Sequence, residues 1–257
     1  MDNENRPFRR GVYLLPNLLT TASLFAGFLG MLYAMRGSYE SAALAIFFSA
    51  LLDGLDGKVA RWTNTASEFG VQYDSLADLV AFGVSPAVLL YHWQVSQFGR
   101  LGIMACFLFM ACGALRLARF NIQSAAASKK FFVGLPIPAA ACTLATLVLV
   151  QPYFQEYMPD KAWAVSCLVL AYLLSFLMVS RLRYASFKEY SMVKAHPFSS
   201  MVTLILLFAL VATQPRLMSF LVMFGYMLSG PIYTLIILPR RISRAIREAR
   251  TAKPGTP

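Results

Sequence analysis

Long apolar segments dominate this sequence and set the strongest limit on how the chain folds. Eight of them run for roughly twenty residues each. A helix of about 20 residues crosses the roughly 30 Å hydrocarbon core of a bilayer, and it satisfies its own backbone hydrogen bonds, as lipid requires. We therefore predict an all-α, polytopic integral membrane protein with about eight transmembrane helices. The predicted spans are 17–35, 41–62, 70–92, 99–119, 135–152, 162–179, 198–213 and 216–238.

The composition agrees with this interpretation, because 58% of the residues are hydrophobic and only 14% are charged. Average globular proteins carry about 25% charged residues. All four cysteines lie inside predicted spans and none forms a CxxC pair, so we interpret them as small apolar packing residues. They are Cys106, Cys112, Cys142 and Cys167.

The basic residues are distributed unevenly between the two predicted sides of the membrane. Of the 23 Lys and Arg residues, 19 fall on the side that holds both termini. The positive-inside rule then predicts a cytoplasmic segment at 1–16 and a basic cytoplasmic tail at 239–257. The net charge of +11 therefore reports orientation in a membrane and gives no reason to expect a nucleic-acid partner. The four basic residues of the other side are Arg36, Arg100, Lys161 and Arg216.

Four aspartates stand where a membrane helix should not carry them, near the cytoplasmic ends of the second and third spans. Asp53 and Asp56 are three residues apart, and Asp74 and Asp78 are four apart. These spacings place each pair on one face of its helix. A carboxylate in a span costs roughly 2.5–3.5 kcal/mol on insertion scales, so a cluster of four indicates function.

Divalent cations are the natural partners of such a cluster. Uncompensated carboxylates repel one another, and ligands that are all oxygen favour Mg²⁺, Mn²⁺ or Ca²⁺ over zinc. Arg61 lies close in sequence, and a guanidinium is well shaped to bind a phosphate. A metal site, a phosphate-binding cation and a lipid setting together indicate phosphoryl chemistry on a lipid.

Two other interpretations use the same carboxylates. A buried ion-pair network would need nearly as many cations, and only Lys58 and Arg61 are close in the sequence. A cation transporter would be expected to hold its carboxylates near the bilayer midplane, whereas these lie toward one face.

The spacing D-x-x-D-G-x-x-A-R-x(8)-G-x(3)-D-x(3)-D resembles the signature of the CDP-alcohol phosphotransferase family at every fixed position. The resemblance implies a single membrane-embedded catalytic domain over 1–257 with a six-helix core, usually a homodimer, that cleaves a CDP-alcohol at its pyrophosphate and releases CMP. The matching residues are Asp53, Asp56, Gly57, Ala60, Arg61, Gly70, Asp74 and Asp78.

Residue roles follow from this resemblance. The four aspartates would hold one or two divalent metals, Mg²⁺ or Mn²⁺, and Asp78 would also act as the general base. The CDP pocket would be lined by Gly57, Ala60, Arg61 and Gly70, and the segment PNLLT resembles the family's entry motif, so that Asn17 and Thr20 would touch the nucleotide.

Four less specific sequence motifs indicate which alcohol accepts the phosphatidyl group. The segments YDSLADLVAFGVSPA, ALRLARFN, FFVGLPIPAAA and SRLRYASFK resemble the serine-using branch of the family. That branch implies CDP-diacylglycerol and L-serine as substrates, at the cytoplasmic face of the cell (inner) membrane. Glycerol 3-phosphate, inositol or choline as acceptor stays open as an alternative.

The segment ALRLARFN offers a place for the acceptor's carboxylate. Arg116 and Arg119 stand at i and i+3, so they can share a helix face, and Asn121 could add an amide contact. The competing interpretation is that both arginines anchor the helix at the interface or bind lipid phosphates.

Overall fold

The protein is a bundle of long helices, seen in a computed structural model that describes residues 14–63, 67–124, 131–185 and 213–237. Its elements run almost entirely helix after helix, with one short ribbon of two strands. The elements are α2 (Leu14–Met35), α3 (Tyr39–Thr63), α4 (Glu68–Asp78), η1 (Leu79–Val84), α5 (Ser85–Trp93), η2 (Val95–Phe98), α6 (Arg100–Ser124), β1 (Phe131–Val133), α7 (Ile137–Phe154), α8 (Asp160–Val179), β2 (Arg183–Ala185), α11 (Pro215–Ile232) and η3 (Tyr233–Ile237).

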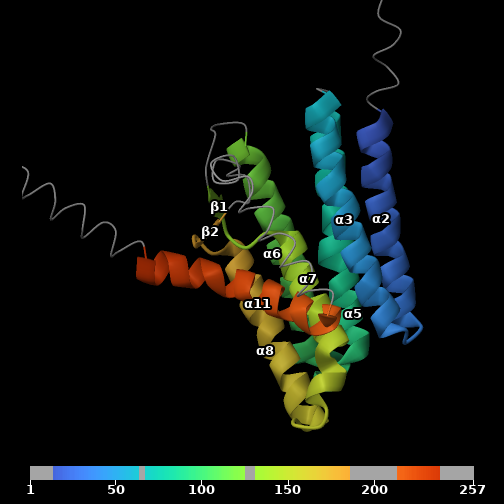
Figure 1. Ribbon diagram of the computed structural model, residues 1–257, viewed down its shortest axis with the longest axis vertical. Coiled ribbons are helices and arrows are strands. Elements are labelled where there is room, and N and C mark those ends of the chain that lie inside the picture. The colour runs from blue at the N-terminus through green and yellow to red at the C-terminus, as the bar shows by residue number, and fades with distance from the viewer. Residues whose placement is uncertain (1–13, 64–66, 125–130, 186–212, 238–257) are drawn as a thin grey trace, which may run out of the picture.

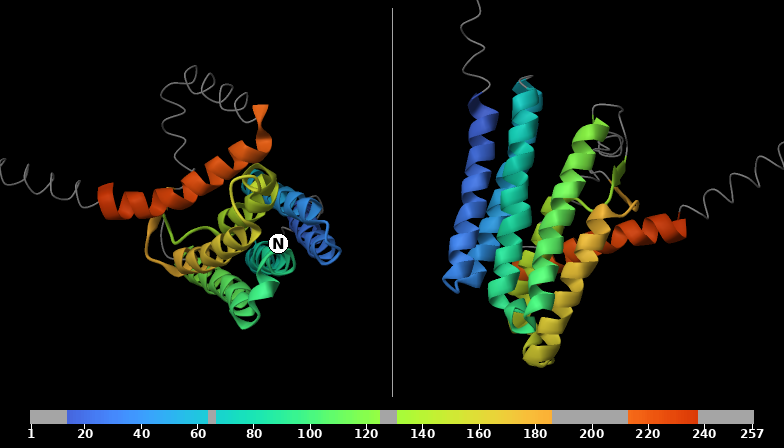
Figure 2. Two further views of the ribbon diagram at one scale, coloured as in Figure 1. Left: turned by 90° about the horizontal axis from the view of Figure 1, so that it is seen from below. Right: turned by 180° about the vertical axis from the view of Figure 1, so that it is seen from behind.

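Six helical rods run up and down in turn and form the body of the bundle (Figures 1 and 2). They are α2, α3, the continuous run α4–η1–α5, α6, α7 and α8. The helix α7 lies at the centre, and every residue from Ala140 to Val150 is buried. The other rods expose apolar side chains on their outer faces, as expected of helices that face lipid.

Within the described residues, six helices are long and apolar enough to cross a membrane. This confirms the all-α, polytopic membrane architecture predicted from the sequence. The helix α3 is not among the six, since Asp53, Asp56 and Lys58 interrupt its apolar sequence. The predicted span 198–213 (up to residue 212) and the predicted cytoplasmic segments 1–16 (up to residue 13) and 239–257 lie outside the described residues, so the total of eight spans stays a prediction.

A π-helical turn, η1, interrupts the third rod directly after Asp78. It allows an unusually close approach by α2, because a Cβ built on Gly27 would lie 2.5 Å from the Ala81 Cα. Only a glycine fits at this contact. Single π turns inside α-helices are often found at functional sites, and this one follows a predicted catalytic residue.

The two strands, which the sequence analysis did not predict, form an antiparallel ribbon at one end of the bundle. Phe132 pairs with Tyr184, which is fully buried. Gly134 ends the first strand with φ +82, a conformation that side chains disfavour, and a Cβ there would lie 2.2 Å from the Met178 carbonyl oxygen. The ribbon therefore joins the start of α7 to the end of α8.

The helix α11 crosses the other helices at a large angle (Figures 1 and 2). Its first turn reaches the start of α3, where Arg216 forms an ion pair with Glu40. Beyond its far end, Thr234 of η3 accepts a hydrogen bond from the Arg183 backbone N–H at 2.9 Å. The two ends of this segment thus contact the start of α3 and the strand β2.

Candidate functional site

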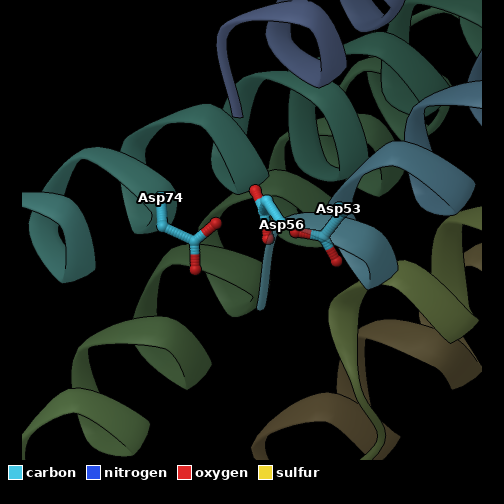
Figure 3. A group of neighbouring side chains, drawn as sticks. All are labelled: Asp53, Asp56 and Asp74. Carbon is cyan, nitrogen blue, oxygen red and sulfur yellow. The ribbon is translucent and has the colours of Figure 1, made fainter. Parts of the chain in front are cut away.

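Three carboxylates from two helices meet near one end of the bundle. Asp53 and Asp56 come from α3 and Asp74 from α4, and one oxygen of each lies within 4.8 Å of the others. Figure 3 shows the three side chains converging between the two helices. Asp56 is buried, while Asp53 and Asp74 are partly exposed. The structure therefore brings together three of the four aspartates that the sequence singled out.

The fourth aspartate lies beside this triad. Asp78 follows Asp74 by one helical turn, and its carboxyl group is within hydrogen-bonding reach of Asp53. Asp78 is also the last residue of α4 before the π-helical turn. Its position is fixed by the junction of α4 and η1 as much as by the spacing of the motif.

The helix α2 contacts the carboxylate cluster and the helix α4 through two hydrogen bonds. The Thr20 hydroxyl donates to Oδ2 of Asp56 at 2.8 Å. One residue further on, the Thr21 and Tyr73 hydroxyls share a hydrogen bond of 2.8 Å, which ties α2 to α4. The sequence predicted Thr20 as a nucleotide contact, and in the structure its hydroxyl has two acceptors, the carboxylate of Asp56 and, at 3.1 Å, the Pro16 carbonyl oxygen of its own helix.

The glycines of the signature differ in their surroundings. A Cβ on Gly57 would meet no described atom within 4 Å, so the space beside Asp56 is open there. A Cβ on Gly70 would lie 3.1 Å from the Ser67 hydroxyl and 3.5 Å from Oδ1 of Asn17. Gly70 therefore brings α4 close to the start of α2. Ala60 and Arg61 lie in the last turns of α3, and their side chains are outside the described part of the chain.

One guanidinium is buried next to the carboxylates. Arg116 of α6 is 7% exposed and lies within electrostatic reach of Asp78 and Asp53. Its Nε atom is buried and has no hydrogen-bond partner among the described residues. The guanidinium stands 5.5 Å from the centre of the Phe120 ring, a cation–π distance.

The two other residues predicted beside Arg116 already hold neighbouring elements. Arg119 donates from Nη1 to the Val179 carbonyl oxygen at 2.9 Å and so caps the end of α8. Asn121 donates from Nδ2 to the Ser75 hydroxyl at 2.9 Å, which links α6 to α4. The sequence placed both arginines on one face, and the structure directs Arg116 toward the carboxylates and Arg119 toward α8.

The carboxylate cluster fits a divalent cation. Oδ1 of Asp74 is buried and has no hydrogen-bond partner among the described residues, although its ionised form would need one. Three carboxylates crowd together with only Arg116 described as a nearby cation. The ligand set of carboxylate oxygens is that preferred by Mg²⁺, Mn²⁺ or Ca²⁺. These residues could therefore hold a metal whose charge offsets their own.

One contributor to the site was missed at the sequence level. Tyr73 carried a usable signal, because it immediately precedes Asp74 and its partner Thr21 immediately follows the PNLLT segment.

Comparison with known families agrees with this geometry. Residues 13–166, more than half of the chain, match the family model described as CDP-alcohol phosphatidyltransferase. The match covers α2 through the first turns of α8 and includes all four aspartates.

Individual relatives extend the similarity. The chain is 44% identical over 180 residues to the CDP-diacylglycerol–serine O-phosphatidyltransferase of Helicobacter pylori, which covers 69% of this chain and 74% of that protein. It is 33% identical over 230 residues to the protein of the same name from Mycobacterium bovis, covering 87% and 79%. It is also 36% identical over 172 residues to the archaetidylserine synthase of Methanothermobacter thermautotrophicus, covering 66% and 69%.

Proposed function

The chain belongs to the CDP-alcohol phosphatidyltransferase family, and we propose that it transfers the phosphatidyl group of CDP-diacylglycerol to the hydroxyl of L-serine. The observation that carries the proposal is similarity over most of the chain to enzymes named for serine. The archaeal relative, also named for a seryl product, supports the same acceptor.

The reaction exchanges one phosphorus–oxygen bond for another. The serine hydroxyl oxygen attacks the phosphatidyl phosphorus, the pyrophosphate bond breaks, and CMP leaves. Asp78 receives the proton of the serine hydroxyl as a general base. Its place beside Asp53 and at the start of η1 holds it next to the carboxylate cluster. Positioning and electrostatics supply most of the catalysis in such transfers.

Asp53, Asp56 and Asp74, with Asp78 at their side, would hold the divalent metal, Mg²⁺ or Mn²⁺. When bound, such a cation neutralises charge that develops on the pyrophosphate oxygens. The Thr20 hydroxyl keeps Asp56 oriented for this role through its 2.8 Å hydrogen bond.

The nucleotide pocket is proposed on the residues of the family signature. Gly57 leaves open space beside Asp56, which suits close approach of a ligand to the α3 backbone. Arg61 is proposed to bind the phosphates. Gly57, Gly70 and Ala60 are proposed as walls of the pocket, with Asn17 and Thr20 near the nucleotide.

The acceptor is proposed to bind on the α6 side of the cluster. Arg116 has a buried Nε with no described partner and lies beside Asp78, the proposed base. A guanidinium there would bind the serine carboxylate and bring the hydroxyl toward Asp78. Arg119 and Asn121 remain proposed acceptor contacts, with Arg119 the weaker candidate because it caps α8.

The proposal includes a location and an assembly. The asymmetry of basic residues supports a cytoplasmic active site and cytoplasmic termini, in the cell (inner) membrane. A single catalytic domain that forms a homodimer follows from the family resemblance.

The deciding experiment supplies the purified protein with CDP-diacylglycerol and Mg²⁺ or Mn²⁺, and offers serine, glycerol 3-phosphate, inositol and choline in separate reactions. CMP release and the lipid product are measured for each acceptor. We expect release that depends on serine and a seryl lipid as product. Faster release with any other acceptor would contradict the serine assignment while leaving the family membership intact.

A further inference from the structure

The helices α5 and α6 enclose an apolar groove with a volume of about 300 Å³. Its lining combines the small side chains of Ala87 and Cys106 with larger ones that include Ile103, Phe107 and Met110. Ile103 and Phe107 are each 52% exposed, so the groove opens on the outer surface of the bundle. That surface faces lipid, because both helices belong to predicted membrane spans.

The groove lies in the half of the membrane opposite the carboxylate cluster. One of its lining residues, His92, is about 20 Å beyond Asp78 along the continuous rod α4–η1–α5, at 1.5 Å per residue. On α6, the distance from Arg100, where the span begins, to Met110 in the lining is about 15 Å by the same rise. The hydrocarbon core is about 30 Å thick, so the groove extends over about one leaflet.

A basic residue stands where this groove meets the membrane surface. Arg100 is the exposed first residue of α6 and forms no ion pair within the described part of the chain. It is three residues from Ile103, which lines the groove, so the two share a helix face. The dipole disfavours a cation at a helix N-terminus, whereas a phosphate there would meet both the guanidinium and the free backbone N–H groups. This end of the groove therefore favours an anionic headgroup.

Two contacts hold the ends of α5 and α6 in place beside the groove. An added Cβ on Gly102 would lie 2.0 Å from the Val95 carbonyl oxygen, so only glycine allows η2 to pack on the first turn of α6. The Tyr39 hydroxyl donates to the His92 carbonyl oxygen at 3.0 Å, which ties the last turn of α5 to α3. The groove is therefore preformed, and a ligand would bind without the cost of ordering its walls.

We propose that this groove binds an anionic phospholipid of the leaflet opposite the carboxylate cluster, with one acyl chain in the groove and the headgroup phosphate at Arg100. A membrane helix of a second copy would need a contact surface along the full thickness of the bilayer, whereas the groove ends near the midplane. Its length and its single basic end fit a lipid of one leaflet. The lipid is a bound partner of the fold, separate from the lipid substrate.

The test measures lipid binding to the purified full-length protein by native mass spectrometry in detergent. Palmitoyl-oleoyl phosphatidylglycerol and phosphatidylcholine with the same chains are added in separate titrations, without CDP-diacylglycerol. We expect one phosphatidylglycerol per chain, bound about fivefold more tightly than phosphatidylcholine, as one basic residue at the membrane surface provides. Because no substrate is present, the result does not depend on the proposed transfer reaction.

Arg100→Gln should remove the preference for phosphatidylglycerol. Its matched control is Lys161→Gln, which removes another exposed basic residue of the same predicted side that does not line the groove. We expect this control to keep the preference. Equal preference in wild type and Arg100→Gln would overturn the assignment of the headgroup.

Cys106→Phe should fill the groove and weaken binding of both lipids about tenfold or more. Met104→Phe is its matched control, because Met104 is 46% exposed on the same helix and does not line the groove. CMP release should stay within about twofold of wild type in both variants, since the groove is about 20 Å from Asp78 along the rod.

Unchanged lipid binding in Cys106→Phe would overturn the proposal. So would a loss of CMP release that parallels the loss of lipid, which would place the substrate in the groove. Dissociation of a dimer in Cys106→Phe with lipid binding intact would instead make a second copy the occupant. If Cys106→Phe does not fold, as judged by thermal melting, the exposed substitution Arg100→Gln decides.

Discussion

The two ends of the helical bundle treat charged groups in opposite ways. At the end near the start of α3, the charged Arg216 pairs with Glu40. The Trp93 indole there donates to Oε1 of Gln151 at 2.9 Å, while the neutral Trp163 indole Nε1 is buried without a partner among the described residues. At the other end, like charges crowd together, and Oδ1 of Asp74 has no partner among the described residues.

The difference distinguishes polar groups that stabilise the fold from groups that we expect to bind a ligand. A pair such as Trp93 and Gln151 is complete within the protein, so it serves packing. The carboxylate cluster is incomplete, and like charges held together cost stability unless a ligand offsets them. Folded proteins commonly accept such a cost at functional sites. We therefore expect the incomplete end to be the one that acts on a substrate.

The largest expected effect comes from neutralising one carboxylate. Replacing Asp74 with Asn should lower the rate of CMP release about 1,000-fold or more, because a metal ligand and its charge are lost together. The same change removes like-charge repulsion, so thermal stability without metal should stay equal or rise. Activity and melting temperature of the purified variant measure both.

Glu40→Gln is the matched control, since it neutralises a carboxylate at the complete end. We expect it to keep activity within about twofold of wild type. Equal losses in Asp74→Asn and Glu40→Gln would remove the contrast between the two ends and refute the functional reading of the cluster.

The second prediction concerns metal binding without turnover. Mg²⁺ or Mn²⁺ at about 100 times its dissociation constant should stabilise the folded wild-type protein by about 2.7 kcal/mol, seen as a rise in melting temperature. Chelator should reverse the rise. The variant Asp53→Asn should show little or no shift, and a full shift in that variant would place the metal elsewhere.

The third prediction tests the hydrogen bond that Thr20 of α2 donates to Asp56. Thr20→Val keeps the shape of the side chain but removes the hydroxyl that donates to Asp56. A hydrogen bond to a charged group contributes roughly 1.5–3 kcal/mol, so kcat/KM should fall about 10- to 100-fold. Thr20→Ser, which keeps the hydroxyl, should retain most of the activity, and equal losses in both variants would contradict the role of this bond.

Sequence reasoning reached the helical architecture and the carboxylate cluster because both depend on local spacing. Runs of about twenty apolar residues specify spans, and the i, i+3 and i, i+4 aspartates share helix faces wherever the helices pack. The family identified from the signature is confirmed by the match over 13–166.

Features that depend on distant contacts could not be predicted. The strands Phe131–Val133 and Arg183–Ala185 are three residues long, too short for a period of two to stand out. The different directions of Arg116 and Arg119 depend on where α8 ends, because Arg119 caps it. The packing of Tyr184 on Gly230 depends on how α11 crosses the bundle, which no local pattern encodes.

The smallest expected effect lies at the complete end. Arg216 and Glu40 are both substantially exposed, with 44% and 54% of their side-chain surfaces accessible, and exposed pairs contribute about 0.2–1 kcal/mol. A double-mutant cycle with Arg216→Gln and Glu40→Gln can be measured by thermal or denaturant unfolding in one detergent. It should give a coupling free energy of about 0.2–1 kcal/mol, and this energy should fall as the salt concentration is raised. The rate of CMP release should change less than twofold in all three variants, because the pair lies at the start of α3 while the carboxylate cluster lies further along α3 and on α4. A loss of CMP release in Arg216→Gln comparable to that expected for Thr20→Val would mean that this pair supports the site as well as the fold, and the division between a structural and a functional end would then fail.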